Sequence, residues 1–192
     1  MDELMTARSL TTRPVVTLGG DAVASVKDTV LDAAAGRIAG FTLTGRGLSG
    51  PLREALPWAS VHALGHDAVM VRDRHALVGA AALTGHLETL RSRVLGAKVL
   101  TEGGAEVGSV LDVVVEGGTG GRVVGFRVAA VKRFAPGPDR RARRVYLPRG
   151  EDLAFAGRTL VLPDDTVRYV AGDLAGFAAL LGSVPGGRGA RP

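Results

Sequence analysis

Two stretches, Ala24-Ser-Val-Lys-Asp-Thr-Val-Leu-Asp32 and Gly108-Ser-Val-Leu-Asp-Val-Val-Val-Glu116, align without a gap and decide the fold of this chain. With one inserted residue, the segments 36–41 and 121–126 then continue the alignment. The identities are Ser25/Ser109, Val26/Val110, Asp28/Asp112, Val30/Val114, Gly36/Gly121, Arg37/Arg122, Gly40/Gly125 and Phe41/Phe126. Self-similarity of this kind marks a structural repeat. The chain therefore contains two copies of one unit.

Each copy is expected to open with a β-hairpin. Residues 23–32 and 106–116 are rich in β-branched side chains, which suit a pleated and half-buried strand. Both runs end in an acidic residue followed by a glycine-containing turn, and the chain returns along 37–43 and 122–131. Gly40 and Gly125 lie inside these return strands and indicate a bulge or the close approach of a neighbouring strand.

Further strands follow each hairpin. Leu56-Pro57 and Leu147-Pro148 match between the copies, and last strands are expected at 68–71 and 159–162. Short strands separated by turns within about 80 residues favour a small closed barrel, which leaves no open sheet edge.

Helices are expected only between and after the copies. Leu87, Leu90 and Val94 recur at helical spacing and predict a linker helix over 84–93. The segment 163–181 opens with acidic residues that suit a helix N-terminus, and it predicts a C-terminal helix. The fold class is therefore mainly β: two tandem small antiparallel barrels at 1–83 and 94–181, a linker helix at 84–93 and a disordered tail at 182–192.

The strand-turn-strand block resembles the PRC-barrel family. Its pattern is an aspartate on the first strand, an acidic-to-glycine turn, a G-[RK]-[IV]-x-G-[FL] return strand and a downstream Leu-Pro strand. The family-motif residues in this chain are Asp28, Gly36, Arg37, Gly40, Phe41, Asp112, Gly121, Arg122, Gly125 and Phe126. The resemblance implies a barrel like the cytoplasmic part of the photosynthetic reaction-centre H subunit and the C-terminal barrel of a ribosome maturation factor. In both, the barrel docks onto other macromolecules and is not itself an enzyme.

Composition excludes several other classes of protein. The chain has no cysteine, so it has no disulfide framework, cysteine nucleophile or iron–sulfur site. The first residues, Met1 to Met5, lack the basic and apolar pattern of a signal peptide, and no apolar run approaches the length of a membrane span. We expect a cytoplasmic protein.

The positive charge is concentrated in the second copy. Residues 1–91 are balanced, so the formal net charge of +5 comes from residues 92–192. Two basic groups flank a Pro- and Gly-containing connection at 134–139 and form a candidate site for an anionic partner: Lys132, Arg133, Arg140, Arg141, Arg143 and Arg144. A solvated loop without a ligand is the alternative.

Motifs for chemistry are weak. Gly45 to Gly50 fit G-x-G-x-x-G, but no parallel βαβ unit surrounds them, which favours a plain loop. His62 and His66 have helical metal-ligand spacing in a stretch that Gly65 interrupts, so a surface or turn role is favoured. Asp28 and Asp112 are the best-placed acids, and an ion pair with Arg37 or Arg122 on the facing arm is the favoured role.

The sequence thus predicts a non-enzymatic interaction or assembly module with no cofactor, no metal and no small-molecule substrate. Its partner is expected to be a protein. The alternative is an RNA- or ribosome-associated factor that binds RNA or another polyanion through the arginine-rich loop of the second copy.

Overall fold

A computed structural model describes residues 3–32, 35–45, 51–84, 88–89, 94–135, 144–150, 154–156 and 158–182. It divides the chain into two compact units, which we call unit 1 and unit 2. Unit 1 contains residues 1–93 together with 114–123, and unit 2 contains residues 94–113 and 124–192. The hairpin tip of the second copy therefore belongs to unit 1.

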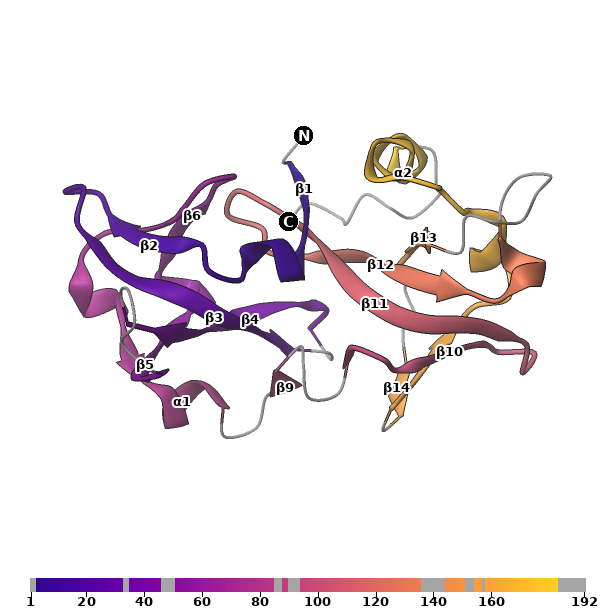
Figure 1. Ribbon diagram of the computed structural model, residues 1–192, viewed down its shortest axis with the longest axis horizontal. Coiled ribbons are helices and arrows are strands. Elements are labelled where there is room, and N and C mark those ends of the chain that lie inside the picture. Colours follow the sequence, from indigo (N-terminus) through magenta and orange to yellow (C-terminus); the bar gives the residue numbers. More distant parts are fainter. Residues whose placement is uncertain are drawn as a thin grey trace. The chain divides into compact units, whose positions relative to one another are not determined.

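The elements up to residue 89 lie in unit 1 (Figure 1). They are β1 (Leu4–Thr6), η1 (Ala7–Leu10), β2 (Pro14–Thr17), β3 (Ala22–Asp32), β4 (Arg37–Thr44), β5 (Pro51–Pro57), η2 (Trp58–Ser60), β6 (Val61–Leu64), β7 (Val69–Val71), η3 (Arg74–Ala76), β8 (Val78–Gly79), α1 (Ala80–Thr84) and β9 (Glu88–Thr89). The strand order in this sheet is β6-β7-β2-β3-β4-β5-β8, and β9 pairs with β3.

The second copy repeats this arrangement. Its elements are β10 (Lys98–Thr101), β11 (Glu106–Glu116), β12 (Val123–Ala130), η5 (Lys132–Phe134), β13 (Arg144–Pro148), β14 (Ala154–Ala156), β15 (Thr159–Leu162), η6 (Thr166–Arg168) and α2 (Leu174–Leu181). Their strand order is β13-β12-β11-β10-β15-β14, and β1 pairs with β11.

The strand registers of the two copies are the same. Pro14 faces Ser25 and, after a bulge, Val16 faces Ala22; the corresponding pairs are Lys98 with Ser109 and Leu100 with Glu106. Two equivalent pairs of short strands also meet in parallel, β2 with β7 and β10 with β15. Matching bulges at matching positions establish the repeat in three dimensions and add one parallel pair to each otherwise antiparallel unit.

The core consists mainly of aliphatic side chains, with one buried phenylalanine at the same position in each copy. Phe41 and Phe126 occupy equivalent positions, and both are fully buried. Val113, Val114 and Val115 are each completely buried, although side chains of a strand alternate between its two faces. Both faces of β11 are therefore covered where the strand ends.

The helices differ from the expected positions. The apolar run Ala80–Thr84 forms α1, and Glu88–Thr89, inside the expected linker helix, form strand β9 on β3. The remainder of 85–93 lies outside the described residues. Alanine and leucine favour a helix, whereas Gly85 ends the run, so the helix comes earlier than the leucine spacing indicated.

The C-terminal helix begins at Leu174 and not at residue 163. Thr166–Arg168 form a short 3-10 turn, and the Asp173 carboxylate caps α2 by accepting a hydrogen bond of 2.7 Å from the Gly176 backbone N–H. A helix start at an N-capping aspartate is the usual rule, and Gly172 separates this cap from the preceding turn. The tail from residue 183 onwards lies outside the described residues.

Candidate interaction surfaces

The hairpin tips of the two copies bind each other within unit 1. The Ile38 N–H donates to the Gly121 carbonyl at 2.8 Å, and the Val123 N–H donates to the Gly36 carbonyl at 2.9 Å. Ile38 is equivalent to Val123 in the repeat, and Gly36 is equivalent to Gly121. Both glycines have a positive φ, 63° and 58°, which allows the turn at each tip. The contact is therefore reciprocal, with the same two positions used from each side.

The strands next to these tips also pair at equivalent positions in the two copies. Strand β9 pairs with Val30 and Leu31 near the end of β3, and β1 pairs with Val114 and Val115 near the end of β11. These four residues are repeat equivalents. Each hairpin thus binds one additional short strand at the same place, and a local two-fold relation extends over this part of unit 1.

Arg37 and Arg122 face each other at the centre of this contact as an antiparallel bridge. Arg122 Nε donates to Glu116 Oε2 at 2.9 Å, while β3 and β4 place Asp32 opposite Arg37. The Asp32 carboxylate accepts from the Ala35 backbone N–H at 2.9 Å. The acids at the turns, and not those within the strands, therefore lie beside these arginines.

Asp28 and Asp112 are buried strand residues. Each carboxylate accepts a hydrogen bond of 2.9 Å from the next backbone N–H, that of Thr29 or of Val113. The sequence suggested Arg37 and Arg122 as their partners. In the structure Arg122 Nε donates to Glu116, the acid at the turn, which antiparallel pairing brings close to the arginine.

Trp58, which the sequence analysis did not single out, covers the tip of the second hairpin. Its indole N–H donates to the Thr119 carbonyl at 3.3 Å, and its ring lies against Phe41 with centroids 6.2 Å apart. A Cβ atom at Gly121 would overlap the indole ring. As the only tryptophan in the chain, Trp58 is also a natural probe of this contact.

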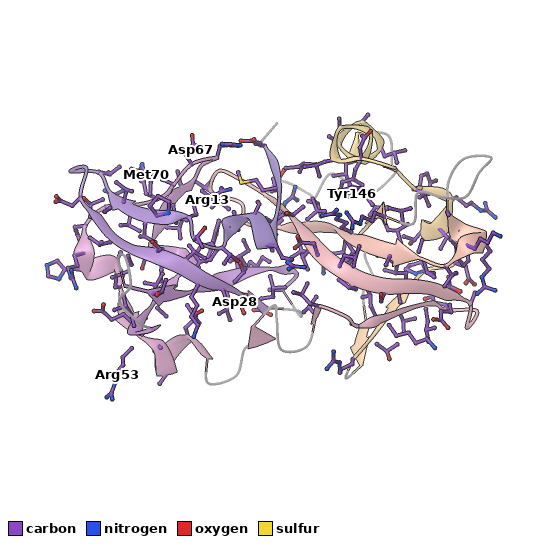
Figure 2. All side chains as sticks on the ribbon, in the orientation of Figure 1. Arg13, Asp28, Arg53, Asp67, Met70 and Tyr146 are labelled. Carbon is purple, nitrogen blue, oxygen red and sulfur yellow. The ribbon has the colours of Figure 1, made fainter. Side chains whose placement is uncertain are left out.

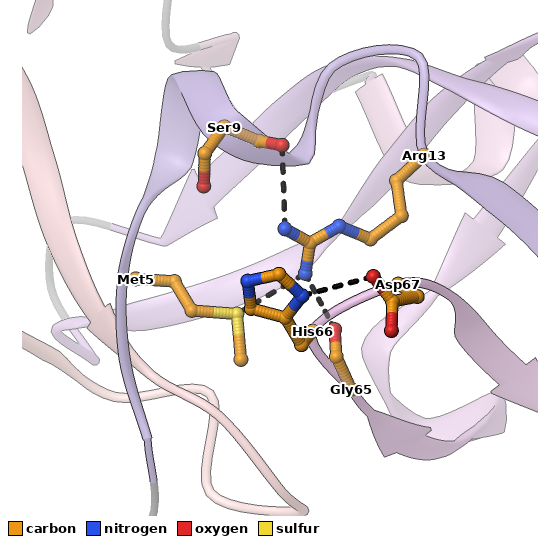
Figure 3. A network of polar contacts seen from close by, with 6 residues as sticks. All are labelled: Met5, Ser9, Arg13, Gly65, His66 and Asp67. Atoms are coloured by element: carbon orange, nitrogen blue, oxygen red, sulfur yellow. Dashed lines mark hydrogen bonds and ion pairs between the residues drawn. The ribbon is translucent and has the colours of Figure 1, made fainter.

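A polar network anchors the segment after β1 (Figure 3). The Arg13 guanidinium donates to the carbonyls of Gly65 and Ser9 and lies 3.1 Å from the sulfur of Met5. His66 and Asp67 are exposed and 2.9 Å apart, and the hydrogen bond to Asp67 raises the pKa of His66. His62 is on strand β6 and His66 is in a turn, so the helical spacing considered for a metal does not exist here.

Two shallow hollows in unit 1 share Arg72 and Asp73. One of them also contains Ser60, His62 and His75. The Asp73 carboxylate accepts from the His75 backbone N–H at 2.7 Å and so caps the turn η3. Across the described part of the chain, no group of three or more potential ligands could hold a metal ion.

The basic connection of the second copy is described only in part. Lys132, Arg133 and Arg144 are exposed, whereas Arg140, Arg141 and Arg143 lie outside the described residues, as do residues 46–50 of the glycine motif. Arg133 is anchored, because it donates to the Glu106 carbonyl at 2.9 Å and lies 5.0 Å from the centre of the Phe134 ring.

Residues 2–78 match the family model of the PRC-barrel domain. The chain therefore contains a PRC-barrel domain in its first copy, and the second copy has the same strand order and register. None of the curated proteins matches this chain. In the portion that the structure describes, no helix combines the length and apolarity needed to cross a membrane.

Proposed function

We propose that this protein is a non-enzymatic module that binds and assembles other macromolecules, with a protein as its partner. The observation that carries the proposal is the reciprocal pairing of the hairpin tips. At this edge one copy of the repeat pairs with the other copy of the same chain through backbone hydrogen bonds from Ile38 and Val123. A repeat with a self-complementary edge is suited to assembly.

Two hollows in unit 1 are compatible with the same proposal. They share Arg72 and Asp73 and are open to solvent, and the Asp73 carboxylate is engaged in capping a turn. A binding site for a small molecule is usually concave and encloses most of its ligand.

The test is affinity purification of the full-length chain from its native cell, with and without nuclease. A defined protein recovered in both samples, which then binds the purified chain with fixed stoichiometry, supports a protein-binding module. If the purified chain forms a complex with none of the recovered proteins and elutes separately from each of them, the proposal is overturned. The same experiment on a variant with Arg53, an exposed residue of β5, changed to Gln is the surface control (Figure 2).

A second function is favoured by the exposed basic residues Lys132, Arg133 and Arg144: binding of RNA or the ribosome through this part of unit 2. Clustered arginines attract and grip phosphates, and the excess positive charge of the chain lies in its second half.

Salt dependence tests this second function. Each phosphate neutralised on single-stranded nucleic acid contributes a log–log slope of about −0.7. Changing the arginines at 140, 141, 143 and 144 to Ser should flatten the slope for total cellular RNA by about 2–3 units. Absence of RNA binding by the unaltered chain at low salt rejects this function and leaves the protein-binding proposal standing.

A further inference from the structure

The two guanidinium groups at the hairpin contact extend from the same face of unit 1. The hydrogen bonds Ile38 to Gly121 and Val123 to Gly36 flank the bridge between Arg37 and Arg122 on both sides. In antiparallel pairing this makes the two arginines a non-hydrogen-bonded pair, whose Cα atoms are about 4.5 Å apart and whose side chains project together.

An anion between the two side chains would relieve the repulsion between their positive charges. Like charges directly opposite each other on paired strands destabilise a sheet. Both residues are exposed, and the Arg122 side chain retains 48% of its accessible surface. Arg122 binds Glu116 through Nε, so the N–H groups of its two terminal nitrogens are not used in that bond. Within the described residues, the Arg37 guanidinium has no ion pair.

We propose that Arg37 and Arg122 form a clamp for one carboxylate of a protein partner. The clamp deepens the proposed function and rests on it, since it names the chemistry that the partner presents. Each guanidinium group offers donors in a planar fork, a geometry that matches a carboxylate. Glu116 acts as a positioning residue, because its bond to Nε sets the orientation of the Arg122 fork.

The surroundings favour one carboxylate over a nucleic acid. Asp32 and Glu116 flank the two arginines, so the local charge of these four residues cancels to zero. A chain of phosphates would bring further negative charges against these acids, whereas an acidic side chain brings only one. The polyanion site of the alternative function, at Lys132 to Arg144, is a separate place in unit 2.

Titration of the full-length chain with sodium acetate at constant ionic strength tests the clamp by NMR. The arginine Nε–H resonances are the signals measured, with chloride as the reference salt. We expect the Arg37 and Arg122 signals to shift together and to saturate with one dissociation constant. Arg53 on β5 should shift only in proportion to the acetate added. An Arg37 signal that behaves like that of Arg53 overturns the proposal.

Variants and peptides then identify the source of the anion. In Arg122→Gln the saturable shift of Arg37 should be lost, while the Trp58 emission and the melting temperature remain those of the unaltered chain. A peptide containing Asp-Glu should bind at least about tenfold more tightly than its Asn-Gln counterpart, and the double variant Arg37→Gln/Arg122→Gln should abolish that difference.

Two further results overturn the clamp. One is tighter binding of oligouridylate than of the acidic peptide at these arginines. The other is a native protein partner retained with unchanged affinity by the double variant. The second result leaves the assembly function intact, so failure of the clamp and failure of the proposed function are distinguishable.

Discussion

Leu83 of α1 occupies the space that Gly40 leaves on β4. A Cβ atom at Gly40 would lie 2.8 Å from Leu83 Cδ2 and would overlap the Leu56 carbonyl oxygen. Leu83 is buried together with Val30 and Ala55. The same relation recurs in unit 2, where the Phe177 ring of α2 packs on Gly125 and is fully buried. Each repeat thus uses a glycine to seat a helix on its sheet.

Replacement of either glycine by alanine should therefore destabilise the fold. Gly40→Ala and Gly125→Ala should each lower the free energy of unfolding by about 2–3 kcal/mol, because the added methyl group meets a backbone oxygen that cannot move away freely. Urea unfolding of the full-length chain measures the effect.

Two other glycines provide matched controls. A Cβ at Gly79 in unit 1 or at Gly172 in unit 2 would meet nothing within 4 Å, and neither residue has a positive φ. Gly79→Ala and Gly172→Ala should leave stability unchanged or raise it by about 0.4–1 kcal/mol. If all four variants unfold at the same urea concentration, the close approach at Gly40 and Gly125 does not contribute to stability.

The hairpins could be predicted because local signals and tertiary structure agree there. Valine-rich runs that end in an acid and a glycine gave β3 and β11 to within about a residue. The pairing of the hairpin tips could not be foreseen, because it joins residues more than 80 positions apart through backbone groups. Such groups carry no residue-specific signal in a sequence.

The helices were misplaced for a related reason. Side-chain periodicity over 84–93 predicted a helix, but strand pairing of Glu88 and Thr89 with β3 prevails over that local pattern. Trp58 was overlooked because one aromatic residue without a repeat partner matches no motif. Its role follows only from contact with the second hairpin.

Thr12 adopts a backbone conformation that glycine holds in the other repeat. Its φ is 71°, and that of the equivalent Gly96 is 77°. The two N–H groups make the same hydrogen bond, to Val26 and Val110 respectively, at 2.8 Å. A left-handed conformation costs a residue with a branched Cβ about 1–2 kcal/mol. Replacement by glycine removes this cost, but the greater freedom of glycine in the unfolded chain cancels a part of the gain.

Thr12→Gly should consequently stabilise the protein by about 0.5–1 kcal/mol. Thr11→Gly is the control, since Thr11 has a φ of −60° and gains nothing from glycine. It should lose about 0.5–1 kcal/mol. Thermal unfolding of the three proteins checks this, and a lower melting temperature for Thr12→Gly contradicts it.

Asp164 makes stability depend on pH. Hydrogen bonds from Thr101 and from the Gly103 N–H lower the pKa of its carboxyl group, and the latter bond is 3.0 Å long. Because the pKa is lower in the folded than in the unfolded protein, the stabilisation is fully present above the unfolded value of about 3.9. It is lost as the pH falls through the folded value.

Asp164→Asn should therefore lower the melting temperature at neutral pH, and the difference from the unaltered chain should shrink below about pH 4. Asp165→Asn is the neighbouring exposed control. If the difference in melting temperature stays constant from pH 7 to pH 3, the effect of Asp164→Asn does not come from the charge of the carboxylate.

Arg133 should differ from the other basic residues of its segment in what it contributes to folding. The guanidinium joins η5 to β11 through the Glu106 carbonyl and lies over the Phe134 ring, whereas Lys132 is exposed beside it. An exposed contact between an arginine and an aromatic ring contributes about 0.5–1 kcal/mol, so Arg133→Ser should lower the free energy of unfolding by about that amount. Lys132→Ser should change it by less than about 0.5 kcal/mol, because it removes one of several neighbouring positive charges and no described contact.

Urea unfolding at low and at moderate salt separates the two contributions. The loss of stability in Arg133→Ser should persist when salt screens the charges, since packing on Phe134 is not screened. Equal stability of the two variants at both salt concentrations would mean that Arg133, like its neighbours, is available for binding without any role in the fold.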